Sequence, residues 1–241
     1  MRSDEACFST ARSETTEIDS ARWKVIMHIH NRLLLRCGLV AGPLFIGSFL
    51  VQGVTRDGYS PIRHSVSTLS LGPRGWMQIA NFAVTGGLSL GFVVGLSRTL
   101  CTQIRTRVGP VLLGGAAIGI LGAAAFPTDP VSGYPPGTPD VPASPTTLGK
   151  VHDLLSTSSF LSVPVAALAF ASAFGRNKER GWATYSAVSG LGMLITFALA
   201  SLGFSQKEGF VEIAGALQRA SIIIGFTWTS SLAARALPAA D

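Results

Sequence analysis

The sequence predicts an all-α, polytopic membrane protein built as a six-helix transmembrane bundle. Six nearly uncharged stretches recur along the 241 residues. Each is about as long as a helix rising ~1.5 Å per residue must be to cross a hydrocarbon layer ~30 Å thick. Only 13% of the residues are charged, and 47% are hydrophobic. The stretches cover residues 34–54, 76–97, 108–126, 154–174, 182–202 and 210–233.

The chain before the first stretch is polar. Residues 1–20 are mostly Ser, Thr and charged residues, and they predict a disordered tail because they have little apolar surface to bury. Residues 21–33 mix basic and apolar side chains at helical spacing, which favours a short amphipathic helix at the inner leaflet. No apolar core of a signal peptide is present, so we expect the first stretch to be an uncleaved anchor. The predicted divisions are a tail (1–33), a transmembrane domain (34–235) and a second tail (236–241).

Basic residues predict the orientation of the bundle. With the N-terminus in the cytoplasm, thirteen of the 19 Lys and Arg residues fall on the inner side, as the positive-inside rule favours. We therefore predict a multi-pass protein of the plasma (cytoplasmic) membrane with both termini cytoplasmic. The formal charge of +6 does not indicate a nucleic-acid partner, because the basic residues form no single stripe with interleaved aromatics.

The three cysteines give no sign of a disulfide or a metal site. Cys7, Cys37 and Cys101 all lie on or near the predicted cytoplasmic side, where disulfides rarely persist. Their spacing contains neither a CxxC motif nor a Cys/His pattern, so we expect reduced thiols that serve as small packing residues. We predict no cofactor.

Small residues recur every fourth position within three of the stretches. Such ridges allow helix backbones to approach closely where lipid provides no hydrophobic drive for association. The spacing favours tight packing inside one bundle, and the alternative is a seam between two copies in a homodimer. The ridges are formed by Gly38 and Gly42, by Gly87, Gly91 and Gly95, and by Gly115 and Gly119.

The first outer connection, residues 55–75, is too polar to enter lipid, yet its apolar residues are regularly spaced. This pattern predicts a short re-entrant or surface helix. We expect Val66 and Leu69 to face the bundle. On the neighbouring polar face we expect a group of candidate ligand-binding side chains at helical spacing, namely Arg63, His64 and Ser67.

The second outer connection, residues 127–153, contains seven prolines. This composition predicts an extended, irregular lid with no helix of its own. Asp129 lies at its start, and His152 and Asp153 lie at its end. At these two hinges a side chain is held firmly by a helix and still reaches water.

Arg219 lies inside the last stretch, about 13 Å along the axis when the helix begins near Phe210. A cation at that depth needs a partner, and Asp129 or Asp153 is the candidate. In the alternative, the span begins near Ala216 and Arg219 extends toward the lipid headgroups.

Four short motifs follow one another along the six stretches. They are RHSVSTLSLGPRG at 63–75, FPTD at 126–129, GKVHD at 149–153 and GALQR at 215–219. In this order they resemble the domain-of-unknown-function 998 family of bacterial and archaeal membrane proteins, and the likeness covers residues 38–235. The resemblance implies a six-helix integral membrane bundle and supplies no activity or catalytic residue.

The polar residues of the outer side allow three functions. In a binding or transport bundle, Arg63, Arg219 and His152 receive a lipid headgroup or a small anionic ligand. In a structural bundle, the same residues fix the helix ends by hydrogen bonds and ion pairs, with no ligand. Membrane lipid is the expected partner in either case.

The third function is hydrolysis of a membrane lipid. His152 acts as a base beside a carboxylate, with Ser65 or Ser67 as nucleophile. A metal held by His64, Asp129, His152 and Asp153 is the variant of this hypothesis that the sequence supports least, because zinc sites generally need three well-placed protein ligands. The candidate site common to the hypotheses comprises Arg63, His64, Ser67, Asp129, His152, Asp153 and Arg219.

Overall fold

The computed structural model describes residues 3–240, with side chains from residue 27 to residue 238. It is an all-α bundle, so the predicted fold class is confirmed. The α-helices are α1 (Ser3–Thr55), α2 (Trp76–Arg98), α3 (Leu100–Gln103), α4 (Val108–Ala125), α5 (Thr147–Arg176), α6 (Arg180–Phe204) and α7 (Ala214–Ala236). Three short 3-10 segments accompany them, namely η1 (Ser67–Ser70), η2 (Val211–Ile213) and η3 (Leu237–Ala240).

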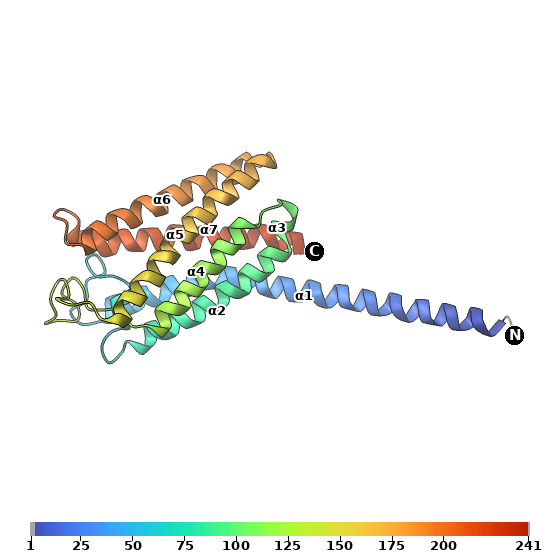
Figure 1. Ribbon diagram of the computed structural model, residues 1–241, viewed down its shortest axis with the longest axis horizontal. Helices are drawn as coiled ribbons and strands as arrows, with labels where there is room; N and C mark the ends of the chain where they lie inside the picture. Colours follow the sequence, from blue (N-terminus) through green and yellow to red (C-terminus); the bar gives the residue numbers. More distant parts are fainter. Residues whose placement is uncertain (1–2, 241) are drawn as a thin grey trace.

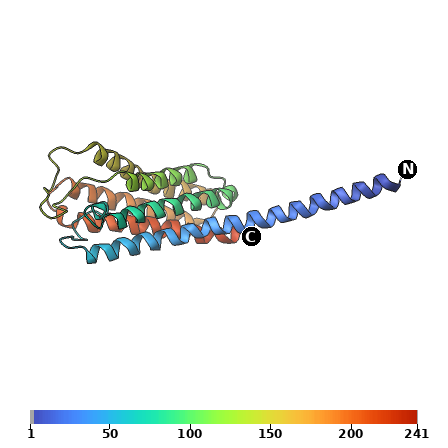
Figure 2. The same ribbon diagram turned by 90° about the horizontal axis from the view of Figure 1, so that it is seen from below.

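The six long helices form a closed ring. Each packs against the next in the order α1, α2, α4, α5, α6 and α7, and α7 then packs against α1 (Figure 1). Seen from below, the bundle is elongated along the helix axes, and neighbouring helices in the ring run antiparallel (Figure 2). Closure places the first and last transmembrane stretches side by side, although the sequence separates them by most of the chain.

Five of these helices are long and apolar enough to cross a membrane. Large apolar side chains such as Val111, Leu154 and Val188 are exposed on the outside of the ring, where lipid replaces water as the solvent. The spans are Met27–Thr55, Trp76–Gln103, Val108–Ala125, Thr147–Arg176 and Arg180–Phe204. The chain is therefore a multi-pass membrane protein.

The sixth predicted stretch, 210–233, contains a helix that is less apolar than the others. Phe210 precedes the 3-10 turn η2, and α7 begins only at Ala214. The buried face of α7 includes Gln218, Arg219 and Ser221, which lower its hydropathy. These polar side chains point into the protein, so α7 completes the ring through polar contacts as well as apolar ones.

α1 is longer than the sequence predicts. The helix begins at Ser3 and continues through the segment for which composition favours disorder. No Gly or Pro precedes Gly38, and an existing helix extends easily through such a segment, because each added residue contributes one hydrogen bond. The N-terminal half of α1 projects beyond the other helices (Figure 1). The division into a tail and a transmembrane domain stays a prediction.

Most of the glycine ridges pack inside the ring. A Cβ atom on Gly38 would lie 2.5 Å from Phe92 Cδ2 in α2, and one on Gly95 would lie 2.9 Å from Leu34 Cβ in α1. On Gly119 it would lie 2.0 Å from the Ser159 hydroxyl oxygen. These close approaches account for the ridges within one chain. Gly87 and Gly115 have nothing within 4 Å of such a Cβ, and the homodimer stays a prediction.

Candidate functional site

Three connections meet at the end of the bundle opposite the two termini (Figure 1). They are residues 56–75, 126–146 and 205–213, between the ends of the helices. We call this end of the bundle the polar end. Four of the seven predicted site residues lie in these connections, and the other three lie in the first two turns of α5 and α7.

The first connection folds into the end of the ring as a plug. Val66 and Leu69 are buried against Phe45, Phe49 and Phe82 of α1 and α2, which confirms that these two residues face the bundle. The regular helix in this connection is only the short 3-10 segment η1. Apolar residues at this spacing therefore fix the connection over the centre of the ring.

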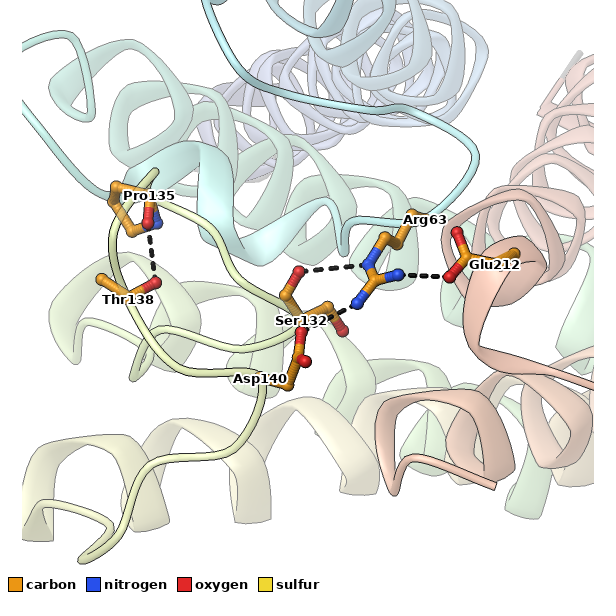
Figure 3. Close-up of polar contacts among 6 residues, drawn as sticks. All are labelled: Arg63, Ser132, Pro135, Thr138, Asp140 and Glu212. Carbon is orange, nitrogen blue, oxygen red and sulfur yellow. Dashed lines mark hydrogen bonds and ion pairs between the residues drawn. The ribbon is translucent and has the colours of Figure 1, made fainter. Parts of the chain in front are cut away.

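Arg63 joins all three connections (Figure 3). Its Nη2 forms an ion pair with Asp140 Oδ1 at 2.8 Å, and its Nη1 forms another with Glu212. Its Nε donates a hydrogen bond to the Ser132 carbonyl oxygen at 3.2 Å. We call Arg63, Ser132, Asp140 and Glu212 the clasp. Two carboxylates already surround the Arg63 guanidinium, so the clasp offers little net charge to an anionic ligand.

His64 lies beneath the clasp between two tyrosine rings. Its ring centroid is 5.3 Å from that of Tyr59 and 5.2 Å from that of Tyr134. Its Nδ1 accepts a hydrogen bond from the Ser60 backbone N–H at 2.9 Å, so this nitrogen carries no proton. Burial lowers the pKa of His64, and the charge of Arg63 lowers it further. The imidazole is therefore neutral at pH 7.

Arg219 has neutral partners, so the prediction of an ion pair with Asp129 or Asp153 is wrong. The side chain is 7% exposed. Its Nη1 donates to the carbonyl oxygens of His64 at 2.9 Å and Gly215 at 3.0 Å, and its Nη2 donates to the Tyr59 hydroxyl. Because α7 begins at Ala214 and not at Phe210, the guanidinium lies close enough to the plug to use its carbonyl oxygens.

Asp129, near the start of the second connection, and His152, just after its end, form a separate group at the start of helix α5, which we call the hinge group. Asp129 accepts hydrogen bonds from the backbone N–H and the hydroxyl of Thr146, both at 2.8 Å. Thr146 in turn accepts from the Gly149 N–H, which satisfies one free donor of the first turn. His152 Nδ1 lies 2.8 Å from the Phe126 carbonyl oxygen, and Asp153 is exposed. These residues connect α4 to α5.

The predicted site residues thus fall into two groups. Arg63, His64 and Arg219 share contacts at the plug, whereas the hinge group of Asp129 and His152 has its own partners. No hydrogen bond between described residues joins a histidine ring to a serine hydroxyl. Among the described side chains no cluster of three His, Cys, Asp or Glu could hold a metal.

A cavity of about 120 Å³ lies at the centre of the ring. Its lining is almost wholly apolar, and Ser67 of the plug and Gln218 of α7 close it toward the polar end. Each of the six long helices contributes side chains to it, for example Phe45, Phe82, Ala117, Phe160, Met193 and Ile222. Ser67 is the predicted site residue that reaches the cavity.

Sequence reasoning missed Gln218. This residue belongs to the GALQR motif, but the motif drew attention only to its arginine. Gln218 is 7% exposed, and its Oε1 accepts a hydrogen bond from the Val66 backbone N–H at 2.8 Å. A glutamine inside an apolar stretch is the available signal, because such a group is costly to bury without a partner.

A second missed group lies between α1 and α2. Gln78 Oε1 accepts hydrogen bonds from Gln52 Nε2 at 3.0 Å and Asn81 Nδ2 at 3.3 Å. Asn81 also donates to the Phe45 carbonyl oxygen. These amides link the two helices inside the bundle, and they come from stretches that look uniformly apolar in a hydropathy average.

A family model described as "Protein of unknown function (DUF998)" matches residues 39–235. The match covers more than half of the chain. The protein belongs to this family. The match begins within α1 and ends within α7, so it includes parts of all six long helices, the plug and the residues that line the cavity. No curated protein and no solved structure matches the chain.

Proposed function

We propose that this membrane protein binds a lipid-like molecule whose apolar chain occupies the central cavity and whose polar part lies at the polar end. The observation that supports this function most directly is the cavity itself. A close-packed interior leaves few voids larger than a water molecule. A space of about 120 Å³ lined by six helices is well above that size.

The lining indicates an apolar occupant. Apolar side chains, with phenylalanine and alanine the commonest, provide most of the wall. The hydroxyl of Ser159 faces α4, where it donates to the Ala116 carbonyl oxygen at 3.0 Å. An apolar cavity of about 150 Å³ stays dry and accepts a molecule the size of benzene, so this cavity suits a section of a hydrocarbon chain.

The polar end suits the other half of such a molecule. The plug and the clasp cover the cavity on that side, and we infer from the predicted orientation of the basic residues that this side lies away from the cytoplasm. The clasp holds the second connection by Arg63 and Asp140. The clasp closes the site and does not bind the ligand, because Asp140 and Glu212 already balance the charge of Arg63.

Photolabelling tests the proposal. The protein is reconstituted in phosphatidylcholine vesicles with a trace of an alkyl probe bearing a diazirine, irradiated, digested and mapped by mass spectrometry. We expect label on inward residues such as Phe160 and Ile222. Ala117→Leu fills the cavity from α4 and removes that label, because Ala117 is buried in the lining.

Ala125→Leu is the matched control, because Ala125 is exposed on the same helix. It leaves the labelling of inward residues unchanged. Label confined to outward residues such as Val111 and Val188, in the unmodified protein and both variants alike, contradicts the proposal.

A further inference from the structure

The polar end of the cavity has an unused hydrogen-bond donor, the side-chain amide of Gln218. The backbone N–H of Val66 is a donor, so the atom that accepts from it must be the amide oxygen. This fixes the orientation of the amide and leaves its NH₂ group. Among the described residues that NH₂ has no hydrogen-bond partner, although Gln218 is more than nine-tenths buried and lines the cavity.

Ser67 provides a second donor beside it. Its hydroxyl also lines the cavity, and no described residue forms a hydrogen bond with it. Ser67 is half-buried and Gln218 is more than nine-tenths buried, and a polar group at an apolar wall is costly when it has no partner. The two donors at one end of the cavity therefore suit an acceptor that arrives with a ligand.

Arg219 adds a buried positive charge beside Gln218. It follows Gln218 in α7, and its hydrogen bonds go to two carbonyl oxygens and a hydroxyl group. No carboxylate of the described residues lies within ion-pair distance of it. Its charge is thus not neutralised by the protein, and electrostatic effects are stronger in a low-dielectric interior than in water.

The size of the cavity restricts the ligand further. A space of about 120 Å³ compares with the volume that accepts one benzene molecule, so it takes a chain section of about six carbons. Two acyl chains side by side do not fit. The ligand class is thus narrower than membrane phospholipid.

We propose that the cavity is a binding site for a single-chain carboxylic acid, whose carboxylate accepts hydrogen bonds from the Gln218 amide and the Ser67 hydroxyl near the positive charge of Arg219. The inference rests on the proposed function, because it needs the chain to lie in the cavity. It identifies the head of the ligand as an anionic acceptor.

Competition with the photolabel tests this inference. Octanoate and 1-octanol are added separately to the reconstituted protein, and the label on Phe160 and Ile222 is measured against competitor concentration. The two competitors share a chain and differ in charge. We expect octanoate to displace the label at a concentration at least tenfold lower than 1-octanol.

Gln218→Glu is the decisive variant. Its carboxylate still accepts from the Val66 N–H, but it replaces the NH₂ donor by an acceptor that repels a carboxylate. We expect at least a tenfold loss of octanoate affinity, with the affinity for 1-octanol changed less than threefold. Ser67→Ala removes the second donor without altering the plug backbone, and we expect a smaller loss for octanoate alone.

The outcomes separate the two proposals. Equal competition by octanoate and 1-octanol, or an unchanged octanoate affinity in both variants, overturns the carboxylate site and leaves the lipid-binding function in place. Absence of label on inward residues, with no effect of either competitor, overturns both.

Discussion

The guanidinium of Arg219 lies 5.6 Å from the centroid of the Tyr59 ring and donates a hydrogen bond to the hydroxyl of the same residue. The two residues are 160 positions apart in the chain. Tyr59 also donates to the Ser65 carbonyl oxygen at 2.8 Å. Burial raises the pKa of Tyr59, so the phenol keeps its proton for that bond. The pair therefore connects the last helix to the plug.

Replacing Arg219 by Met should destabilise the protein strongly. The substitution leaves the His64 carbonyl oxygen without this donor and removes a donor to the Tyr59 hydroxyl, and each unsatisfied buried group costs about 1–3 kcal/mol. The measurement is the midpoint of thermal unfolding in detergent. Arg219→Lys keeps the charge but loses the planar guanidinium with its several N–H donors, so we expect the unfolding midpoint to recover only in part.

Tyr59→Phe serves as the control for this effect. Combined with Arg219→Met in a double-mutant cycle, it isolates the energy of the pair. Additive shifts of the unfolding midpoint, with no coupling between the two substitutions, would show that the contact between Arg219 and Tyr59 contributes nothing of its own.

Loss of the clasp should loosen the second connection and leave the bundle intact. The ion pairs of Arg63 are partly exposed, so each is worth roughly 0.2–1 kcal/mol. We expect Asp140→Asn to increase cleavage of residues 127–146 by proteinase K, with little change in the unfolding midpoint. Asp57→Asn is the matched control, because Asp57 is fully exposed and lies 4.0 Å from Arg74.

Salt gives an independent measure of the same contact. Added NaCl screens the partly exposed ion pairs of the clasp. Cleavage of the unmodified protein should therefore rise with salt, and cleavage of Asp140→Asn should rise less. Equal cleavage of all three proteins at every salt concentration contradicts a role of the clasp in holding this segment.

Hydropathy and spacing are enough to predict the bundle, because five of its long helices carry a strong apolar signal and the sixth stretch, 210–233, is nearly uncharged. They also predict the burial of Val66 and Leu69, since two apolar residues three apart in a polar connection imply one shared face. Ring closure between α7 and α1 has no such local signal. It depends on which helices pack together after the spans have formed.

The partners of Arg219 illustrate what the sequence does not contain. A carboxylate is visible in a sequence, whereas a backbone carbonyl oxygen is present at every residue and its position depends on the fold. The sequence therefore suggested Asp129 and Asp153 and gave no reason to choose the carbonyl of His64. Gln218 was missed for a related reason, because only packing shows that it borders a cavity.

Acidification should destabilise the polar end through His64. The pKa of this residue is lowered from 6.5 in the folded protein. Between the two pKa values the unfolded chain binds a proton that the folded chain does not, so stability is complete above pH 6.5 and falls as the pH drops below it. We expect the unfolding midpoint to decrease from pH 7.5 to pH 5.5.

His64→Asn is the comparison for this pH effect. The Asn oxygen can accept the hydrogen bond of the Ser60 N–H, and it does not titrate. The variant should show a weaker dependence on pH over the same range. An identical slope in both proteins assigns the pH effect to other groups.

The glycine ridges yield a prediction that separates packing within the chain from association between chains. Gly38→Ala brings a methyl group within 2.5 Å of Phe92, so we expect destabilisation of about 1–3 kcal/mol. Gly87→Ala meets nothing within 4 Å and adds a better helix former, so the same change there should be neutral or slightly stabilising. Gly87→Ile extends the test to the predicted homodimer, because Gly87 is exposed and a bulky group there blocks a seam between two copies. A fall in particle mass caused by Gly87→Ile, measured by light scattering in detergent, assigns Gly87 to a dimer interface. An unchanged mass contradicts a dimer seam at Gly87.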